Sequence, residues 1–569
     1  MKKLMAICLL LTGAFLVCAS FASAVTEEWV VRYDGPASSS DQAAAMAVDA
    51  AGNVYVTGRS RGNGTQDDYA TAKYDAGGNE LWVSRYDGPW NAVDWALALA
   101  VDAAGNVYVA GESDGSGWPV KDKGRDYATV KYDAGGSELW VRRYNGPWSS
   151  VDSAAAIAVD GSGNVYITGR SVGYNTHLDY ATIKYDTDGN ALWVARYDNQ
   201  GKFLVDAARA IAVDASGNVY VAGKSQGDGT GFDYATVKYD ANGNELWTAR
   251  YNGPGNSDDN LHALAVDASG NVYVTGSSPG SGTGSDCATV KYDASGGEVW
   301  VRRYNGPANG TDYGHAMVLD ASGNIYVAGS SDGVGTRRDY LTIKYGPDGD
   351  ELWAATYDGP WNDGDKAFAI ALDALANVYV TGGASGGPTY LDYATLKYDA
   401  DGNELWVASY DGPVSGSDVT VAVALDSLGN VYVTGESAGG GTGQDYATIK
   451  YSQPLPATVD IAPGAINLRS RGKYLTCHIE LPAGGDINDI DVASVAITKD
   501  GASVPAEPSP TEVGDFDSDG VADLMVKFDR RSVHQMLSAG HAQLAVSGSL
   551  AGGPVFVGAA TVNVIAPGR

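Results

Sequence analysis

The densest group of potential metal ligands is a short acidic segment near the C-terminal end of the sequence. The pattern D-x-D-x-D-G-x-x-D spans residues 515–523, and its glycine permits a sharp turn. Alternate carboxylates and one backbone carbonyl are the ligands with which a short loop surrounds a hard cation such as calcium. Position twelve of the loop is Val526, so the glutamate of an EF-hand is missing, and an Asp-rich turn without metal is the alternative. The predicted ligands are Asp515, Asp517, Asp519, the carbonyl of Val521, and Asp523.

A second set of chemically active side chains occupies one position in three consecutive repeat units. Arg209, His262 and His315 each stand five residues before an aspartate that ends a repeated segment. Imidazole can serve as a metal ligand and as an acid or base, so a metal pair or a catalytic site is one interpretation. Because no third ligand is defined, a polar lining of a central channel is the other interpretation.

Tryptophans gather in the segments that differ between repeat units. Aromatic rings beside Asp and Asn on a polar surface are typical of sugar-stacking sites, and packing of loops against one another is the alternative. The predicted ligand-binding residues are Trp90, Trp118, Trp148 and Trp361.

Two sets of aspartates occur once in every repeat unit. A residue present in every unit is expected to hold the units together, and cation capture is the alternative. The first set is Asp41, Asp94, Asp152, Asp206, Asp259, Asp312, Asp365 and Asp418, and the second is Asp68, Asp126, Asp179, Asp233, Asp286, Asp339, Asp392 and Asp445.

The elements that must position these residues are set by an eightfold repeat. The segment V-D-A-A-G-N-V-Y-V-T-G at 48–58 returns at residues 101, 159, 213, 266, 319, 372 and 425, in steps of 53 to 58 residues. A period of this size, made of short strand-like pieces, indicates a propeller or solenoid. In the third unit the predicted strands are 156–160, 164–169, 180–185 and 192–197, joined by turns of the D-x-x-G-N type.

The two ends of the repeat array predict a closed ring of eight blades. Residues 29–33 form a fourth strand with no first three before it, whereas the last unit stops at Tyr451 without its fourth strand. The N-terminal strand is therefore expected to complete the last blade, which leaves no open ladder edge.

The motifs G-N-V-Y-V-T-G, D-Y-A-T-x-K-Y-D and G-N-E-L-W resemble the bacterial SBBP-type beta-propeller repeat, and they are also similar to NHL-type blades. The resemblance covers residues 29–451. It implies a propeller of an exported or cell-surface protein, and it implies seven blades, whereas the repeat count predicts eight.

The predicted organisation has four parts. A charged start, an apolar run and Ala22-Ser23-Ala24 indicate a signal peptide over residues 1–24. The propeller is expected over 25–451, a linker over 452–456 and a β-sandwich over 457–569, with strands at 475–481, 522–528, 542–546 and 555–557. The last part resembles immunoglobulin-like modules of secreted microbial proteins.

The composition narrows the classes of partner. Without Lys2 and Lys3, 36 basic residues face 69 acidic ones, a formal charge of −33. This disfavours nucleic acid and anionic membranes, which require positive patches. Two cysteines remain beyond the leader, Cys287 and Cys477, so a disulfide framework is not expected.

The sequence thus predicts an all-β protein with an eight-bladed propeller and a β-sandwich, exported to the cell surface, the medium or the periplasm. The leading functional hypothesis is a monomeric, non-catalytic binding or scaffold protein for a glycan or an extracellular protein, with no membrane span and with calcium in the acidic loop. One alternative is a polysaccharide lyase or hydrolase, and another is a passive surface or matrix component.

Overall fold

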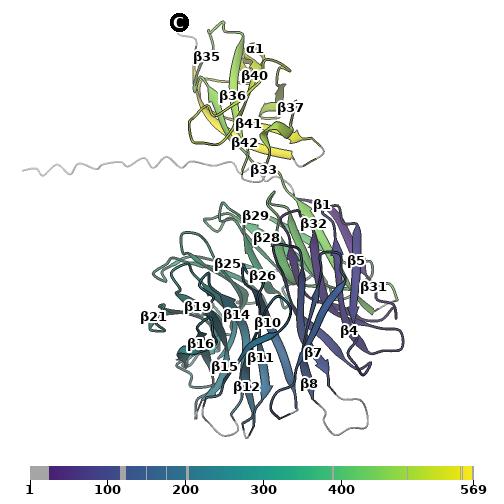
Figure 1. Cartoon of the computed structure of the whole chain (residues 1–569). Helices are drawn as coiled ribbons and strands as arrows, with labels where there is room; N and C mark the ends of the chain where they lie inside the picture. The colour runs from purple at the N-terminus through teal and green to yellow at the C-terminus, as the bar shows by residue number, and fades with distance from the viewer. Residues whose placement is uncertain are drawn as a thin grey trace, which may run out of the picture.

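The computed structural model is an all-β molecule with one short α-helix. It describes residues 25–566, apart from 116–123, 149, 175, 200–203, 228, 388–389, 442, 483–484, 552 and 554. Eight four-stranded antiparallel sheets surround a common axis, and two further sheets follow them in the chain (Figure 1). The predicted fold class is confirmed, including the count of eight blades.

The first seven blades are meanders of four consecutive strands. They are β2 (Asp41–Val48), β3 (Val54–Arg61), β4 (Asp67–Tyr74) and β5 (Glu80–Tyr86); β6 (Asp94–Val101), β7 (Val107–Asp114), β8 (Arg125–Tyr132) and β9 (Glu138–Tyr144); β10 (Asp152–Val159), β11 (Val165–Val172), β12 (Leu178–Tyr185) and β13 (Ala191–Tyr197); β14 (Asp206–Val213), β15 (Val219–Gly227), β16 (Gly231–Tyr239) and β17 (Glu245–Tyr251); β18 (Asn260–Val266), β19 (Val272–Pro279), β20 (Ser285–Tyr292) and β21 (Glu298–Tyr304); β22 (Asp312–Leu319), β23 (Ile325–Asp332), β24 (Arg338–Tyr345) and β25 (Glu351–Tyr357); and β26 (Lys366–Leu372), β27 (Val378–Ser385), β28 (Leu391–Tyr398) and β29 (Glu404–Tyr410). The first strand of the third blade starts at Asp152, four residues before the predicted start, because a bulge between Ala154 and Ala156 lets pairing continue.

The eighth blade joins the two ends of the propeller. It consists of β30 (Val419–Leu425), β31 (Val431–Gly439), β32 (Gly443–Ser452) and, as its outer strand, β1 (Thr26–Tyr33). The innermost strand β2 contacts both β6 and β30, so the ring is closed. Closure leaves the eight blades without an open end, as the repeat ends predict.

Tight turns fix the first hairpin of each blade. In the first blade, the Asp49 carboxylate accepts hydrogen bonds from the backbone N–H groups of Ala51 and Asn53, and from the Tyr55 hydroxyl at 2.9 Å. These donors favour the ionised carboxylate and lower the pKa of Asp49. Gly52 has φ +77°, a conformation that glycine adopts without strain.

Neighbouring blades are joined by buried tyrosines of the third strands. The Tyr69 hydroxyl, for example, donates to the Ala128 carbonyl of the next blade at 3.1 Å. The Trp82 indole and the Lys73 ammonium both donate to the Ala134 carbonyl in the next blade's second turn. These bonds satisfy polar groups inside a stack whose strands are buried on both faces.

Two sheets packed around one apolar core form the C-terminal part. One sheet contains β33 (Leu455–Pro456), β35 (Ala465–Asn467), β37 (Ile490–Lys499), β38 (Ala502–Pro505), β41 (Gly540–Leu550) and β42 (Val555–Ile565); the other contains β34 (Thr458–Ala462), β36 (Tyr474–Glu480), β39 (Glu512–Gly514) and β40 (Asp523–Asp529). Helix α1 (Arg530–Gln535) and a 3-10 turn at Ile487–Asp489 complete it. The strand β37 has no counterpart among the predicted strands, while the other long strands overlap them.

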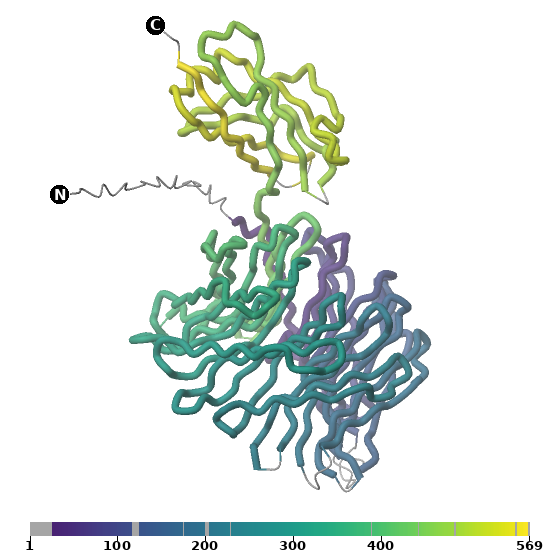
Figure 2. The backbone as a smooth tube through the Cα atoms, turned by 90° about the vertical axis from the view of Figure 1, so that its left-hand side faces the viewer, coloured from purple at the N-terminus to yellow at the C-terminus, as the bar shows by residue number. Residues whose placement is uncertain are grey.

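The segment predicted to be a linker is held at both of its ends. The Gln453 amide donates to the Tyr379 hydroxyl at 2.6 Å and to the Gly429 carbonyl at 2.7 Å. Leu455, only 2% exposed, belongs to the C-terminal core, and Leu428 of the propeller packs against the same core. Figure 2 shows this single narrow connection between the two parts.

Candidate functional site

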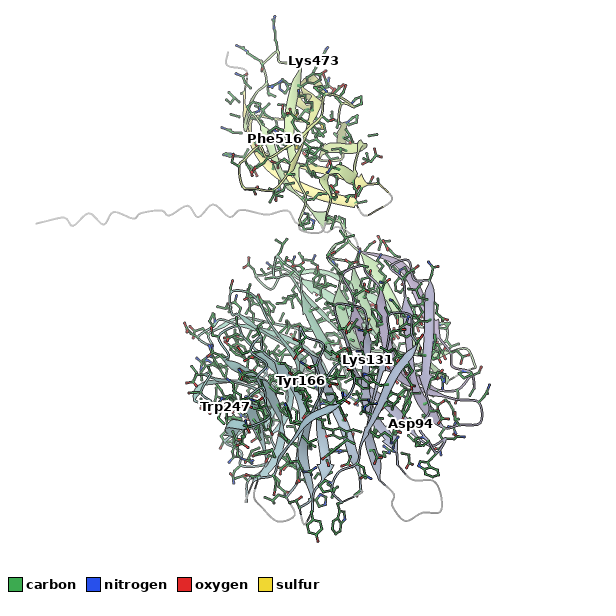
Figure 3. The ribbon with its side chains drawn as sticks, viewed as in Figure 1. Asp94, Lys131, Tyr166, Trp247, Lys473 and Phe516 are labelled. Carbon is green, nitrogen blue, oxygen red and sulfur yellow. The ribbon has the colours of Figure 1, made fainter. Side chains whose placement is uncertain are left out.

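The two ends of the propeller differ in what covers them. The turn between β30 and β31 and the turn between β26 and β27 line a pocket shared with Pro482 and Val557 of the C-terminal sheets. The variable loops lie at the opposite end, and Figure 3 places Asp94, which follows one of them, on the half of the propeller remote from those sheets. The C-terminal sheets, as far as the structure describes them, therefore do not cover the variable face.

A pocket of about 550 Å³ opens on the variable face beside the third blade. Trp148, in the segment from β9 to β10, forms one side. Thr176 and His177, in the segment from β11 to β12, form the other, and Arg170 on β11 contributes a cation. The pocket thus combines aromatic surface with hydrogen-bond donors, as small-ligand sites do.

An aromatic pair adjoins this pocket, because Trp148, which lines it, also contacts Tyr174. The Trp148 and Tyr174 rings stand edge to face with centroids 5.4 Å apart. They are 54% and 68% exposed, so most of each ring faces solvent. Of the predicted tryptophans, Trp148 is thus placed at a pocket. Tyr174 was not predicted, although its position in a variable loop two residues before a threonine and a histidine carried the signal.

The other predicted tryptophans lie elsewhere. Trp90 and Trp361 are 53% and 55% exposed on the same face, and the Trp90 indole donates to the Gly115 carbonyl at 3.1 Å. Trp118 lies outside the described residues. Trp95 is sandwiched between the guanidinium groups of Arg59 and Arg125, 4.7 and 4.4 Å from its ring, so it serves packing between blades.

The three positional candidates line the axis together. The His262 and His315 rings stack with centroids 5.2 Å apart, and His315 also contacts Phe368. Burial is the main cause that lowers the pKa of His262, with the charge of Arg209 contributing, and burial lowers the pKa of His315 to about 3. Both imidazoles are therefore neutral at neutral pH, and His315 is a weak base.

The repeated aspartates meet at the junctions between blades. In the first set, Asp94 accepts a hydrogen bond from the backbone N–H of Gly88 at 2.7 Å and is buried. Burial raises its pKa to about 6. In the second set, Asp68 accepts from Arg85 at 2.9 Å, and this arginine also donates to the Tyr33 hydroxyl of the preceding blade. Both sets therefore contribute to joining the blades.

Among the described residues, at least five junctions bring three aspartates together. At each of them, one carboxylate oxygen per residue lies within 4.8 Å of the other two, so these groups could hold a metal ion. The sets are Asp34, Asp41 and Asp445; Asp68, Asp87 and Asp94; Asp179, Asp198 and Asp206; Asp339, Asp358 and Asp365; and Asp392, Asp411 and Asp418.

The predicted calcium loop forms the hairpin between β39 and β40. The Asp515 carboxylate accepts from the N–H groups of Asp519 and Gly520, both at 3.2 Å, which curls the loop around its acidic side chains. Asp523 is buried and accepts a hydrogen bond from the N–H of Phe516, which is labelled in Figure 3. The Phe516 ring stacks on that of His478, with centroids 4.7 Å apart. The loop is therefore anchored to the sheet beneath it.

A further carboxylate faces this loop from the neighbouring strand. Glu480 on β36 pairs with Asp523 on β40. Beside burial, the charges of Asp519, Asp517 and Asp523 raise the pKa of Glu480. Its proximity depends on strand pairing across 43 residues of sequence, which no motif could reveal.

Comparisons with known proteins agree with the propeller geometry. The family model described as SBBP, beta-propeller repeat, matches residues 139–175, 246–282 and 299–335, each running from a fourth strand through the following hairpin. The chain contains SBBP beta-propeller repeats. These repeats position the pocket and the junctions described above.

Two curated relatives are similar over part of their length. An uncharacterized WD repeat-containing protein, L264, of Acanthamoeba polyphaga mimivirus is 24% identical over 376 residues, which is 54% of this chain and 26% of the viral protein. The regulatory protein FlaEY of Caulobacter vibrioides is 28% identical over 148 residues, 22% of this chain and 15% of FlaEY. The chain thus spans about a quarter or less of these relatives.

Solved structures that match part of the chain include two proteins of unknown function. The one from Bacteroides caccae is 12% identical, with a TM-score of 0.30, and the match covers 50% of this chain and 89% of that one. The one from Dyadobacter fermentans is 12% identical, with a TM-score of 0.32, and the match covers 58% and 98%. Within the described residues, no helix is long and apolar enough to cross a bilayer.

Proposed function

We propose that this protein is an exported, non-catalytic binding protein that uses the variable face of its propeller to bind a glycan. The observation that carries the proposal is the exposed pair Trp148 and Tyr174 adjoining a 550 Å³ pocket. Adjoining exposed aromatic rings mark binding surfaces on soluble proteins, and the C-terminal sheets do not cover this face.

The chemistry of the pocket favours a sugar over an apolar ligand. The flat rings of Trp148 and Tyr174 can stack against the C–H face of a pyranose, and Thr176, His177 and Arg170 can bond its hydroxyls. The guanidinium of Arg170 would in addition favour a ligand that carries a carboxylate or sulfate. A loop of an extracellular protein is the competing ligand.

Binding, rather than turnover, is favoured by where the titratable groups lie. The pocket is lined by the third blade and the segment leading into it, whereas His262 and His315 lie on β18 and β22 near the axis. Burial keeps both imidazoles uncharged at neutral pH, so neither is a ready proton donor. A polysaccharide-active enzyme places its acid and base within hydrogen-bond reach of the substrate, and these imidazoles do not line the pocket.

A glycan array followed by calorimetric titration tests the proposal. Trp148→Ala should weaken binding of the best glycan at least tenfold and leave the melting temperature within about 2 °C, because the side chain is half exposed. Trp361→Ala is the matched control, since it is equally exposed on the same face away from the pocket. Equal losses in both variants, or no glycan bound at all, would refute the proposal.

We further propose that the hairpin loop at 515–523 binds calcium and stabilises the C-terminal sheets. Asp515, Asp517, Asp519 and the Val521 carbonyl supply oxygens from the loop, and Asp523 anchors it. Glu480 on the adjacent strand supplies the additional carboxylate that the loop lacks at its twelfth position. Oxygen ligands of this number and charge are those that calcium prefers.

A further inference from the structure

Six of the eight blades place an arginine against the aspartate that begins the third strand. These junction arginines bind the aspartate at 2.7–3.0 Å, and they are Arg32, Arg85, Arg143, Arg196, Arg250 and Arg303. Each also donates to a tyrosine hydroxyl of the preceding blade. In these blades a fixed cation neutralises one carboxylate of the junction.

The sixth and seventh blades lack this arginine. The same position of the fourth strand holds Thr356 in the sixth blade and Ser409 in the seventh. Both of these junctions nevertheless keep three aspartates. With all groups ionised, the sixth junction, of Asp339, Asp358 and Asp365, carries a charge of −3, whereas junctions with an arginine carry −2 or −1.

Asp339 in the sixth blade is buried without the partner that its counterparts have. It is 7% exposed, and its Oδ2 accepts one hydrogen bond, from the Thr336 hydroxyl at 3.1 Å. Its Oδ1 is fully enclosed and has no hydrogen-bond partner among the described residues. The same is true of Oδ1 in Asp68, Asp179 and Asp233, so Asp339 differs from these counterparts in lacking the arginine that binds their Oδ2. A buried carboxylate without a compensating cation lowers the stability of the folded state.

The cations nearest in sequence are bound elsewhere. Arg337 binds Asp363 at 2.9 Å, and Arg338 binds Asp332 through its Nε at 3.4 Å. Neither of these two arginines therefore binds Asp339 in place of the junction arginine that Thr356 replaces.

The geometry of the three carboxylates fits a hard divalent cation. Their oxygens lie within 4.8 Å of one another, and two ligands of one calcium ion, each at 2.3–2.6 Å, stand at most about 5 Å apart. Asp365 is oriented by the N–H groups of Gly359 and Ser385, both at 2.6 Å, and Asp358 is exposed. Water can complete the coordination on the exposed side.

We propose that Asp339, Asp358 and Asp365 bind a divalent cation of the calcium type between the sixth and seventh blades, where it supplies the positive charge that Thr356 does not. This site is separate from the calcium loop and from the Trp148 pocket. In this site the ion would neutralise the third-strand aspartate, as Arg85 does in the first blade, and it would join the sixth blade to the seventh.

The test counts calcium ions bound by the full chain at neutral pH, by equilibrium dialysis at micromolar to low millimolar calcium. The background variant is Asp517→Ala with Ser409→Arg, which removes the C-terminal loop site and fills the seventh junction. We expect one calcium ion per chain in this background. Adding Thr356→Arg should abolish binding, because it restores the arginine of the other blades, and adding Thr356→Ser should preserve it.

Two further variants make the test independent of any loss of folding. Arg85→Thr opens a junction that already holds Asp68, Asp87 and Asp94, so it should add one bound ion. Arg143→Thr is its control, because Asn145 stands there in place of the middle aspartate and no ion should be gained. The proposal would be overturned if the background variant bound no calcium. It would also be overturned if calcium binding persisted after Thr356→Arg or was unchanged by Asp339→Asn.

Discussion

Cys287 and Leu341 are a matched pair at the junction between the fifth and sixth blades. At the other seven junctions a third-strand tyrosine donates to the carbonyl of an alanine in the next blade, and here cysteine replaces the tyrosine and leucine the alanine. Both side chains are fully buried in one cluster. The larger leucine thus fills volume that the smaller cysteine leaves.

This pairing predicts a coupled pair of substitutions. Cys287→Tyr alone should destabilise the protein by about 1–3 kcal/mol, because Leu341 occupies the space that the ring needs. Leu341→Ala alone should cost about 2–5 kcal/mol through the cavity that it leaves. The double variant should recover at least about 1 kcal/mol relative to the sum. Denaturant unfolding of the parent, the two single variants and the double variant measures this coupling. Free-energy changes that simply add would contradict the pairing.

The junction aspartates predict that the metal-free propeller is more stable at mildly acidic pH. The folded pKa of Asp94, about 6, lies above its ordinary value of 3.8, so the folded state binds more protons between these values. The stability that protonation gives is full below about pH 4 and is lost as pH rises through 6. The pKa of Asp49 and its counterparts is lowered instead, so stability falls again in stronger acid.

Denaturant unfolding in chelator at pH 5 and pH 7 measures this effect. The free energy of unfolding should be higher at pH 5, and Asp94→Asn should reduce the difference, since the amide does not titrate. An unchanged pH difference in Asp94→Asn would show that other groups control it.

The closing strand predicts the outcome of an N-terminal deletion. Removing residues 28–34 takes away most of β1 and the ion pair of Arg32 with Asp445, which leaves the outer edge of β32 unpaired. An open edge favours aggregation, so the variant should form oligomers in light scattering and melt at a lower temperature. The single change Arg32→Ala, which keeps the strand, should leave the protein monomeric. A monomeric deletion variant with the parent's melting temperature would contradict closure by β1.

The acidic hairpin predicts calcium-dependent stability of the C-terminal sheets. Calcium at about a hundredfold above its dissociation constant should stabilise this part by about 2.7 kcal/mol, and a chelator should remove that gain. Asp517→Ala should mimic the chelator, and Glu480→Gln should weaken calcium binding, because Glu480 faces the loop. Glu512→Gln, an exposed acid on the adjacent strand, is the control. Calorimetry of the full chain follows the C-terminal transition, and a trace unchanged by chelation would contradict the assignment.

The propeller itself could be predicted from sequence because each repeat carries its own strand and turn signals. Asp49, Gly52 and Asn53 specify a hairpin locally, and eight copies specify the ring. The pocket could not be predicted, because the meeting of Trp148 with Tyr174 depends on how two variable loops lie. Glu480 was missed for the same reason, since only the pairing of β36 with β40 brings it to the acidic loop.

The missing junction arginine can be found by comparing the repeat units, but its consequence cannot. Comparison of the units reveals the substitution Thr356 for arginine in the sequence itself. Its meaning depends on the structure, which shows that the arginine of the other blades binds the third-strand aspartate and that Asp339 is buried without this partner. The repeat identified the scaffold, and the departures from it identified the candidate sites.

Closure of the ring by β1 also sets the order of events during synthesis. Arg32 and its partner Asp445 are 413 residues apart in the sequence. The strand β1 can therefore pair only after β32, the last propeller strand in the chain, has been synthesised. At about 5–20 residues per second, a ribosome needs roughly 20–80 s to span that distance. During this interval the nascent chain carries an unpaired edge at each end of a growing arc. Until the eighth blade is complete, these edges remain open to pairing with other chains.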